Sequence, residues 1–243
     1  MARITVVGMG PGERSMMTEQ ALSALDKADV IIGYTVYLRL LGDRYSGKEL
    51  LSTPMKQEVE RCRMCFEQAE LGKNVVMICS GDAGIYGMAS LMIELAEEYG
   101  MEDIVDIVPG ITAASSGAAE LGAPLNHDFC VISLSDLLTP WELIEKRLHA
   151  AAAGDFAIAI YNPSSRKRHD YLQKACDILL ETVSPERPCG YVKNIGREGT
   201  EHIVCTLSEL RNAHVDMFTT VFIGNSQSRI IGDRLVTPRG YKL

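Results

Sequence analysis

Short runs of valine and isoleucine alternate along this chain with longer segments of helical period, and this alternation constrains the fold more than any other feature. Such apolar runs predict strands at residues 4–7, 30–32, 75–79, 104–108, 129–133, 157–161, 190–193, 202–205 and 220–223. Apolar residues at helical spacing predict helices at residues 18–27, 58–71, 88–99, 112–121, 141–152 and 171–182. The alternation indicates the α/β class, with sheets covered on both faces and much parallel pairing.

The rhythm of the pattern changes after Asn162, where shorter turns between the predicted strands favour antiparallel pairing. The segment GAPLN at residues 122–126 interrupts the preceding helical pattern with glycine and proline, so it is the best candidate for a linker. We therefore expect two α/β domains, residues 1–122 and 123–243.

The composition is that of an ordinary globular protein, with 47% hydrophobic residues and a formal net charge of -8 in 243 residues. This charge argues against nucleic acid and anionic membrane surfaces as partners, because both favour positively charged proteins. No apolar stretch reaches the roughly 18 residues of a membrane span. The start MARITVVGMG lacks a basic region followed by a cleavable apolar segment. We expect a cytoplasmic protein.

The sequence contains seven cysteines, an odd number, and most of them stand singly in apolar surroundings, as at Cys79, Cys130 and Cys205. This pattern predicts buried free thiols in a reducing compartment rather than a disulfide framework. Cys62 and Cys65 form a C-x-x-C pair, but they share helical spacing with apolar neighbours, which favours a packed helix face. A zinc site would need a second pair at matching spacing, so no metal site is predicted.

The first predicted strand ends in VVGMGPGE at residues 6–13, which looks like a nucleotide-binding loop. A dinucleotide fingerprint needs G-x-G-x-x-G and an acidic residue about 20 positions further on. Gly8 and Gly10 fit that pattern, but Glu13 replaces the third glycine and Pro11 removes a backbone N–H. The loop is therefore either a simple chain reversal or a turn whose missing side chains leave room for a bulky ligand.

Three later strand ends carry the same kinds of residue. The run VVMICS leads into GDAGIYG, DIVDIV leads into PGITAASS, and AIAIY leads into NPSSRKR. Each places glycine, proline, small hydroxyl residues or a lone carboxylate at the carboxyl end of a strand, where open α/β sheets bind ligands. Four such ends in one chain predict a composite ligand site.

On these segments the sequence resembles the tetrapyrrole methylase family, and the resemblance runs over nearly the whole chain. It implies two α/β domains of the tetrapyrrole methylase fold, with the active site in the cleft between them. It also implies S-adenosylmethionine (SAM) as methyl donor, S-adenosylhomocysteine as its product, a tetrapyrrole substrate and a homodimer.

Carried over residue by residue, the resemblance places one set of residues around SAM: Pro11, Ser80, Gly81, Asp82, Ile85, Thr112, Ala113, Asn162, Lys193, Asn194 and Ile195. The residue types suit that role. Gly81 and Gly84 allow close backbone approach, Asp82 can accept hydrogen bonds from hydroxyl or ammonium donors, and Ile85 supplies an apolar wall. The alternative for Asp82 is an N-cap of the following helix.

Within the family, GDAGIYGMA, ISLSDLLTPW and YNPSSRKR look most like the branch that methylates C17 of a cobalamin-pathway tetrapyrrole, precorrin-3B or cobalt-factor III. Methyl transfer needs placement of the acceptor carbon about 3 to 3.5 Å from the methyl group, and no nucleophilic side chain. The resemblance also implies ring contraction, which needs proton transfer and carbonyl polarisation. The candidates are Ser133, Asp136 and His127, with Ser135 beside them. A lone histidine after a linker is also commonly a structural hydrogen-bonding residue.

The carboxylates of a tetrapyrrole call for a locally basic site despite the acidic net charge. The candidates for substrate binding are Gly10 and Arg14 in the first glycine loop and Arg166, which stands with Lys167 and Arg168. The alternative for residues 166–168 is the start of a solvated helix.

Other functions remain open at this point. One is a family member acting on a different corrin carbon, on RNA or on a modified histidine, although the net charge counts against RNA. Others are an NAD-dependent oxidoreductase and a non-catalytic corrinoid carrier. Precorrin-3B and cobalt-factor III are both open as substrates. The seven cysteines and eleven methionines oxidise readily, which favours an oxygen-independent route.

Overall fold

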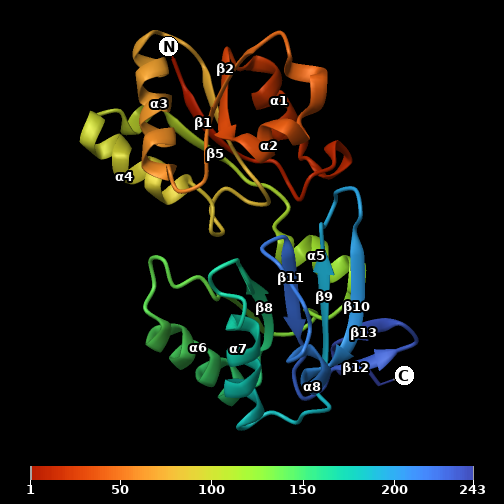
Figure 1. Cartoon of the computed structure of the whole chain (residues 1–243). Coiled ribbons are helices and arrows are strands. Elements are labelled where there is room, and N and C mark those ends of the chain that lie inside the picture. Colours follow the sequence, from red (N-terminus) through yellow and green to blue (C-terminus); the bar gives the residue numbers. More distant parts are fainter. Residues whose placement is uncertain (1, 243) are drawn as a thin grey trace. The chain divides into compact units, whose positions relative to one another are not determined.

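The computed structural model describes residues 2–242, in which the chain forms two units, Met1–Ala113 and Ala114–Leu243 (Figure 1). Each unit is built on one five-stranded sheet, and the second unit also contains a three-stranded sheet. The α/β class predicted from the sequence is confirmed. Within residues 2–242, every helix is too short or too polar to span a bilayer.

The sheet of the first unit is entirely parallel, in the order β3-β2-β4-β1-β5. Its strands are β1 (Ile4–Gly8), β2 (Val30–Tyr34), β3 (Glu49–Thr53), β4 (Val75–Cys79) and β5 (Val105–Val108). Ile4 of β1 pairs with Val75 of β4 and with Val105 of β5. Because all of the strands run in one direction, their carboxyl ends lie along a single edge of the sheet.

Helices cover both faces of this sheet, α1 and α2 on one side and α3 and α4 on the other (Figure 1). They are α1 (Glu19–Lys27), α2 (Thr35–Leu40), α3 (Glu58–Glu70) and α4 (Ala89–Tyr99), with short 3-10 helices η1 (Arg14–Met16), η2 (Gly42–Tyr45) and η3 (Glu102–Ile104). Successive residues of β1 point to opposite faces, so Val6 packs with α3 and α4 while Val7 packs with α1. Burial on both faces explains why the inner strands β2 and β4 are nearly continuous apolar runs.

The sheet of the second unit is mixed, in the order β10-β9-β11-β8-β7. Its strands are β7 (Phe129–Ser133), β8 (Ala157–Tyr161), β9 (Pro188–Lys193), β10 (Glu201–Thr206) and β11 (Thr219–Ile223). Strands β7 and β8 are parallel, and every other pairing in this sheet is antiparallel. The antiparallel pairing predicted after Asn162 is therefore confirmed.

Helices also cover both faces of the second sheet. One face carries α6 (Trp141–Ala153), α7 (Tyr171–Leu180) and α8 (Leu207–Leu210), and the other carries α5 (Ala113–Leu121). A Cβ on Gly117 of α5 would lie 2.9 Å from side-chain atoms of Ile195 and Phe222. A Cβ on Gly190 of β9 would lie 2.8 Å from Leu121. This close packing places α5 with the second unit, so the units divide at the start of α5, between Ala113 and Ala114, whereas the boundary expected from the sequence lies after residue 122.

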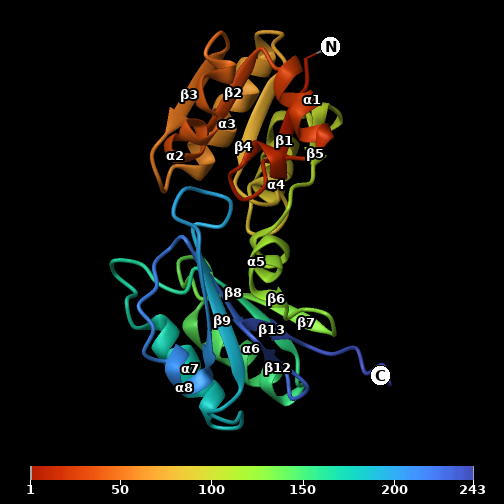
Figure 2. The ribbon, with the colours of Figure 1, turned by 90° about the vertical axis from the view of Figure 1, so that its right-hand side faces the viewer.

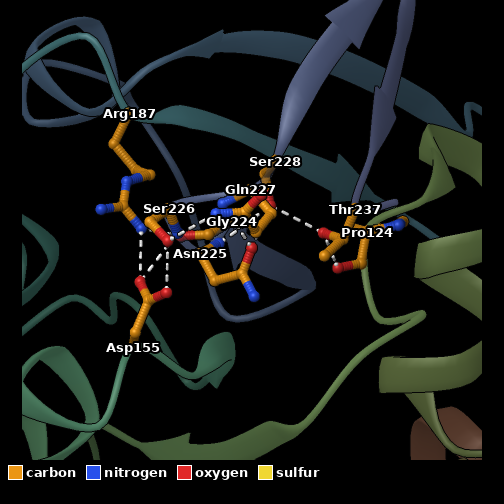
Figure 3. Close-up of polar contacts among 9 residues, drawn as sticks. All are labelled: Pro124, Asp155, Arg187, Gly224, Asn225, Ser226, Gln227, Ser228 and Thr237. Atoms are coloured by element: carbon orange, nitrogen blue, oxygen red, sulfur yellow. Dashed lines mark hydrogen bonds and ion pairs between the residues drawn. The ribbon is translucent and has the colours of Figure 1, made fainter. Parts of the chain in front are cut away.

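The segment expected to be a linker, residues 122–126, contains the short strand β6 (Gly122–Ala123). It joins a three-stranded sheet with β12 (Arg229–Ile231) and β13 (Arg234–Val236), in which β6 and β13 are parallel (Figure 2). The Thr237 hydroxyl donates to the Pro124 carbonyl oxygen at 2.5 Å and shares a 2.7 Å hydrogen bond with the Ser228 hydroxyl (Figure 3). The segment is thus held against the end of the chain.

A second group of polar contacts lies beside this tie and involves the turn before β8 (Figure 3). The Asp155 carboxylate accepts hydrogen bonds from the Ser226 backbone N–H at 2.8 Å, the Ser226 hydroxyl at 2.5 Å and Arg187 Nη1 at 3.2 Å. The same Arg187 nitrogen donates to the Gly224 carbonyl oxygen at 3.2 Å. These contacts fix the loop that leads from β11 to β12.

All seven cysteines are free thiols, and all but the half-buried Cys130 are buried. Cys62 and Cys65 lie on the inner face of α3. Burial raises the pKa of the Cys62 thiol to about 12 and that of Cys130 to about 11. The predictions of buried free thiols and of a packed C-x-x-C face are confirmed.

Every strand and helix predicted from the sequence forms, with shifts of a few residues at the ends. The elements that were not predicted are short or lie at sheet edges: α2, α8, β3, β6, β12, β13 and the 3-10 helices η1, η2 and η3.

Candidate functional site

Loops that follow β1, β4 and β5 meet at the carboxyl edge of the first sheet. Gly10 N donates to the Gly81 carbonyl oxygen at 3.0 Å, and Gly81 N donates to the Gly10 carbonyl oxygen at 2.7 Å. Both glycines have positive φ angles, 71° and 69°, which side-chain-bearing residues rarely adopt. The first glycine loop is therefore bonded reciprocally to the loop after β4.

The loop after β5 packs against the same two loops through Gly110. A Cβ on Gly110 would lie 2.1 Å from the Gly81 carbonyl oxygen and 2.5 Å from the Gly8 carbonyl oxygen. A Cβ on Gly8 would lie 2.6 Å from Gly110 N. Only glycine permits this backbone-to-backbone contact. We call Gly8, Gly10, Gly81 and Gly110 together the glycine junction.

Asp82 fixes the junction from one side. Its Oδ1 accepts hydrogen bonds from Gly84 N at 2.8 Å and Ile85 N at 3.1 Å, and its Oδ2 accepts one from Gly110 N at 2.9 Å. The N-cap alternative for Asp82 is wrong, because α4 begins at Ala89 and its N-cap is Met88. Asp82 instead ties the loop after β4 to the loop after β5.

Side chains around the junction are either small and polar or apolar and exposed. Ser80 and Thr112 are half-buried, and Pro11 is buried. Ile85 is 39% exposed and Ile111 is 37% exposed. The edge thus offers an apolar surface beside backbone and hydroxyl groups. The structure brings together several of the predicted site residues there: Gly10, Gly81, Asp82, Ile85 and Ala113.

The predicted residues of the second unit lie partly at the carboxyl ends of the parallel pair β7 and β8. Ser133 ends β7, and its Oγ accepts hydrogen bonds from Asn162 Nδ2 at 2.9 Å and Ser135 N at 3.2 Å. Asn162 directly follows β8 and has a φ of 52°. The structure therefore brings Ser133 and Asn162 together.

Asp136 lies on the loop after β7, between a cation and a hydroxyl. Its Oδ1 is 2.6 Å from Arg168 Nε, and its Oδ2 accepts a hydrogen bond from the Tyr171 hydroxyl at 2.7 Å. The Tyr171 hydrogen bond, together with the charge of Arg168, lowers the pKa of Asp136. The carboxyl group is therefore ionised at neutral pH and suits holding two loops together better than donating a proton.

His127 does not join the other two catalytic candidates. It lies before the amino end of β7, whereas Ser133 lies at the carboxyl end, and a five-residue strand spans about 13 Å. His127 Nδ1 accepts a hydrogen bond from Asp128 N at 3.0 Å. The three candidates therefore do not form one catalytic cluster.

The stretch Lys193, Asn194 and Ile195 lies at the end of β9. Lys193 Nζ is 3.9 Å from a carboxylate oxygen of Glu201, and Asn194 has a φ of 50°. Ile195 is only 5% exposed and packs against Gly117, so a ligand would reach its backbone rather than its side chain.

The basic candidates differ in how far their charges are engaged. Arg14 on η1 and Arg166 are exposed, and Arg168 is paired with Asp136. The alternative that residues 166–168 begin a helix is wrong, because α7 begins at Tyr171.

One charged residue at the carboxyl edge of the first sheet was missed by the sequence analysis. Arg61 on α3 is 5% exposed and donates to the Thr53 hydroxyl at the end of β3. Its burial could have been predicted from its position in the sequence, because it precedes the buried Cys65 by four residues and so lies on the apolar face of the helix. Among residues 2–242, no group of three or more His, Cys, Asp or Glu side chains is arranged to hold a metal ion.

Comparison with known proteins gives concordant matches. Residues 3–211 match the family model described as Tetrapyrrole (Corrin/Porphyrin) Methylases. The chain is similar to a probable cobalt-factor III C(17)-methyltransferase of Salmonella typhimurium, with 45% identity covering 99% of this chain and 100% of that protein. It is 44% identical to the cobalt-factor III methyltransferase of Priestia megaterium, covering 99% of this chain and 45% of that longer protein. It is 36% identical to the precorrin-3B C(17)-methyltransferase of a Sinorhizobium species, over 97% of this chain and 96% of that one.

Solved structures agree with these matches. The methyltransferase CobJ has a TM-score of 0.91 and 37% identity, covering 98% of this chain and 100% of that chain. A uroporphyrin-III C-methyltransferase of Thermus thermophilus, solved with S-adenosylhomocysteine, has a TM-score of 0.70 at 20% identity, covering 92% of this chain and 97% of that chain. The second likeness concerns the fold alone.

Proposed function

This chain belongs to the tetrapyrrole (corrin/porphyrin) methylase family, and from that premise we propose that it transfers a methyl group from SAM to C17 of a cobalamin-pathway tetrapyrrole, with accompanying ring contraction. The observation that carries the proposal is full-length similarity to proteins named as C17-methyltransferases. CobJ, the more similar of the two solved methyltransferases, supports the same reading.

Cobalt-factor III is the substrate we favour, and precorrin-3B is the alternative. The relatives named for cobalt-factor III are 45% and 44% identical, against 36% for the one named for precorrin-3B.

The glycine junction fits SAM in its chemistry. SAM supplies the methyl group, and binding it requires exposed backbone and short polar side chains for its amino acid and ribose, and an apolar surface for its adenine. In the first unit the proposed SAM-binding residues are Pro11, Ser80, Gly81, Asp82, Ile85, Thr112 and Ala113. This edge is held in one conformation before a ligand binds, by the reciprocal hydrogen bonds between Gly10 and Gly81 and by the three hydrogen bonds to Asp82. Such preorganisation lowers the entropic cost of binding. Asn162, Lys193, Asn194 and Ile195 stay predictions for the second unit.

The same contacts argue against the dinucleotide alternative. A pyrophosphate cradle uses backbone N–H groups of the first glycine loop, but Gly10 N is already bonded to the Gly81 carbonyl oxygen. NAD would have to break that pairing.

For ring contraction we propose Ser133 as a hydrogen-bond donor and Asp136 as a positioning residue. Ser133 Oγ accepts two hydrogen bonds, and within residues 2–242 its own O–H donates to no group, so that proton can polarise a substrate carbonyl. Asp136 positions the loop that carries Leu137 and Leu138 through Arg168 and Tyr171. His127 remains a candidate only for a separate role.

Gly10, Arg14 and Arg166 remain proposed contacts for the tetrapyrrole. The two arginines are exposed and lie next to candidate ligand loops, after β1 and after β8. A homodimer and a cytoplasmic location also remain proposals.

The test is an anaerobic assay of the purified protein with SAM and either cobalt-factor III or precorrin-3B. We expect S-adenosylhomocysteine and a product that carries one additional methyl group, with C20 outside the contracted ring. Ser133→Ala should retain methylation and lose contraction. If titration showed that the protein binds NAD but not SAM, the proposal would be refuted. If the protein bound SAM but turned over neither tetrapyrrole, its substrate would be a different one within the family.

A further inference from the structure

We infer that Arg61, together with Thr53 and Tyr34, forms a subsite for a carboxylate of the ligand, and that the carboxylate is an acetate or propionate arm of the tetrapyrrole. The inference rests on the proposed function, which supplies a substrate with several carboxylates. It concerns a different part of the sheet edge from the glycine junction.

Arg61 is a nearly buried cation with neutral partners. Its Nε donates to the Thr53 hydroxyl at 2.9 Å, and its Nη2 donates to the Pro54 carbonyl oxygen at 3.1 Å. Its Cζ lies 6.0 Å from the centroid of the Tyr34 ring. The side chain thus stands in a cradle of a hydroxyl, a carbonyl and an aromatic ring.

No carboxylate neutralises this charge. Among residues 2–242, Arg61 makes no ion pair within 4.0 Å, although the residue is only 5% exposed. A buried cation without an anion is costly, because burial removes water and nothing of opposite charge replaces it. A carboxylate of a ligand would supply the missing opposite charge.

One nitrogen of the guanidinium is left for a ligand. In the described part of the chain, Nη1 has no hydrogen-bond partner, and no fully buried side-chain nitrogen or oxygen lacks one. Nη1 must therefore reach solvent. A planar guanidinium that is held by two hydrogen bonds, and whose remaining nitrogen reaches solvent, is suited to donate to a carboxylate.

The subsite lies at the ligand-binding edge of the sheet. Thr53 ends β3, Tyr34 ends β2, and the two residues pair across these strands. The strand order places β2 next to β4 and two strands from β1, so the cradle is on the order of 10 Å along the edge from the glycine junction. A broad macrocycle with charged arms can extend along such an edge. Because SAM also has a carboxylate, the experiment must distinguish a carboxylate of the tetrapyrrole from the carboxylate of SAM.

The variants are Arg61→Gln and Arg61→Lys, with Arg63→Gln as the matched control, because Arg63 is an exposed arginine on the same helix. The measurements are KM for cobalt-factor III, Kd for SAM by calorimetry and the thermal midpoint. For Arg61→Gln we expect KM to rise about tenfold or more, the range for a charged hydrogen bond, while Kd for SAM changes less than about twofold. Arg61→Lys should recover part of the loss, and Arg63→Gln should match the wild type.

A second measurement needs no folded Arg61 variant. In wild-type protein with 15N-labelled arginine side chains, uroporphyrin III, a stable tetrapyrrole polycarboxylate, should shift the Arg61 Nε resonance, and S-adenosylhomocysteine should not. Three results would each overturn the tetrapyrrole assignment. They are an unchanged KM for cobalt-factor III in folded Arg61→Gln, an Arg61 resonance that does not shift when uroporphyrin III is bound, and a selective loss of SAM affinity. A parallel loss of both affinities with a lower thermal midpoint would make Arg61 purely structural. Wild-type protein that methylates neither tetrapyrrole would instead refute the proposed function.

Discussion

Asp136 lies between the Arg168 guanidinium and the Tyr171 hydroxyl, and both interactions favour its charged form. Its pKa therefore lies below the ordinary value of 3.8, first through the Tyr171 hydrogen bond and then through Arg168. A group with a lowered folded-state pKa contributes stability that is fully present above its unfolded value and is lost as the pH falls through the folded value.

Asp136→Asn should lower the thermal midpoint at pH 7 modestly, because a partly exposed ion pair contributes at most about 1 kcal/mol. The difference from wild type should stay constant down to about pH 5 and shrink as the pH falls below 3.8. Thermal melts of both proteins between pH 3 and pH 7 measure it. A difference that grows on acidification would contradict the assigned charge state, and Asp233→Asn, at a side chain 89% exposed, is the control.

Arg61 and Asp82 show what residue type alone cannot tell about a site. Helical spacing places Arg61 on an apolar face, but its neutral partners on β3 and the following loop become visible only in the folded chain. Asp82 comes shortly after the end of β4, a position typical of a carboxylate that binds a ligand. In the structure, however, one of its oxygens accepts a hydrogen bond from the backbone N–H of Gly110, 28 residues away. Contacts of this range depend on strand order, which local sequence patterns do not encode.

At the scale of elements, the glycine junction brings the loops after β1, β4 and β5 into backbone-to-backbone contact, and the Asp82 side chain adds a hydrogen bond to Gly110. Gly110 contributes most directly, because a Cβ there would lie 2.1 Å from the Gly81 carbonyl oxygen. A side chain at that position has to push the loops apart.

Gly110→Ala should destabilise the protein by about 1–3 kcal/mol through overpacking and weaken SAM binding at least about tenfold. Denaturant unfolding and SAM calorimetry measure the two effects. Gly47→Ala is the matched control, since nothing lies within 4 Å of a Cβ at Gly47. Full SAM affinity in Gly110→Ala would exclude the junction as the binding edge.

The elements that could be predicted from the sequence are those with strong apolar periodicity, such as β4, buried at every residue. The strand β3, ELLST, lies at the sheet edge and is mostly exposed, so its polar residues mask the pattern. Helix α2, TVYLRL, follows β2 without a turn and begins with β-branched residues that favour strands. Strand β6 has two residues and exists only because β13 pairs with it.

At the scale of the whole molecule, the tie between residues 122–124 and the end of the chain links segments more than a hundred positions apart. The Thr237 side chain is fully buried, and its hydroxyl bonds to the Pro124 carbonyl oxygen and the Ser228 hydroxyl. Removing that hydroxyl takes this hydrogen bond from the buried Pro124 carbonyl oxygen, whereas the Ser228 hydroxyl keeps its hydrogen bonds with Asn225.

Thr237→Val preserves the shape of the side chain and should cost about 1–3 kcal/mol in the free energy of unfolding. Urea unfolding followed by fluorescence measures this, with the exposed Thr182→Val as control. SAM affinity should stay close to wild type, because none of the proposed SAM-binding residues contacts Thr237. Equal stability of both variants would mean that water replaces the lost hydroxyl.

The pairing of β6 with β13 also sets an order of events during synthesis. Gly122 and Ala123 are made more than a hundred residues before their partners Leu235 and Val236. Until then β6 has no strand to join, and the Pro124 carbonyl oxygen has no hydroxyl from Thr237. The fold of the second unit can therefore be completed only after residue 237 has been made, so a ribosome that stalls before that residue leaves this joint open.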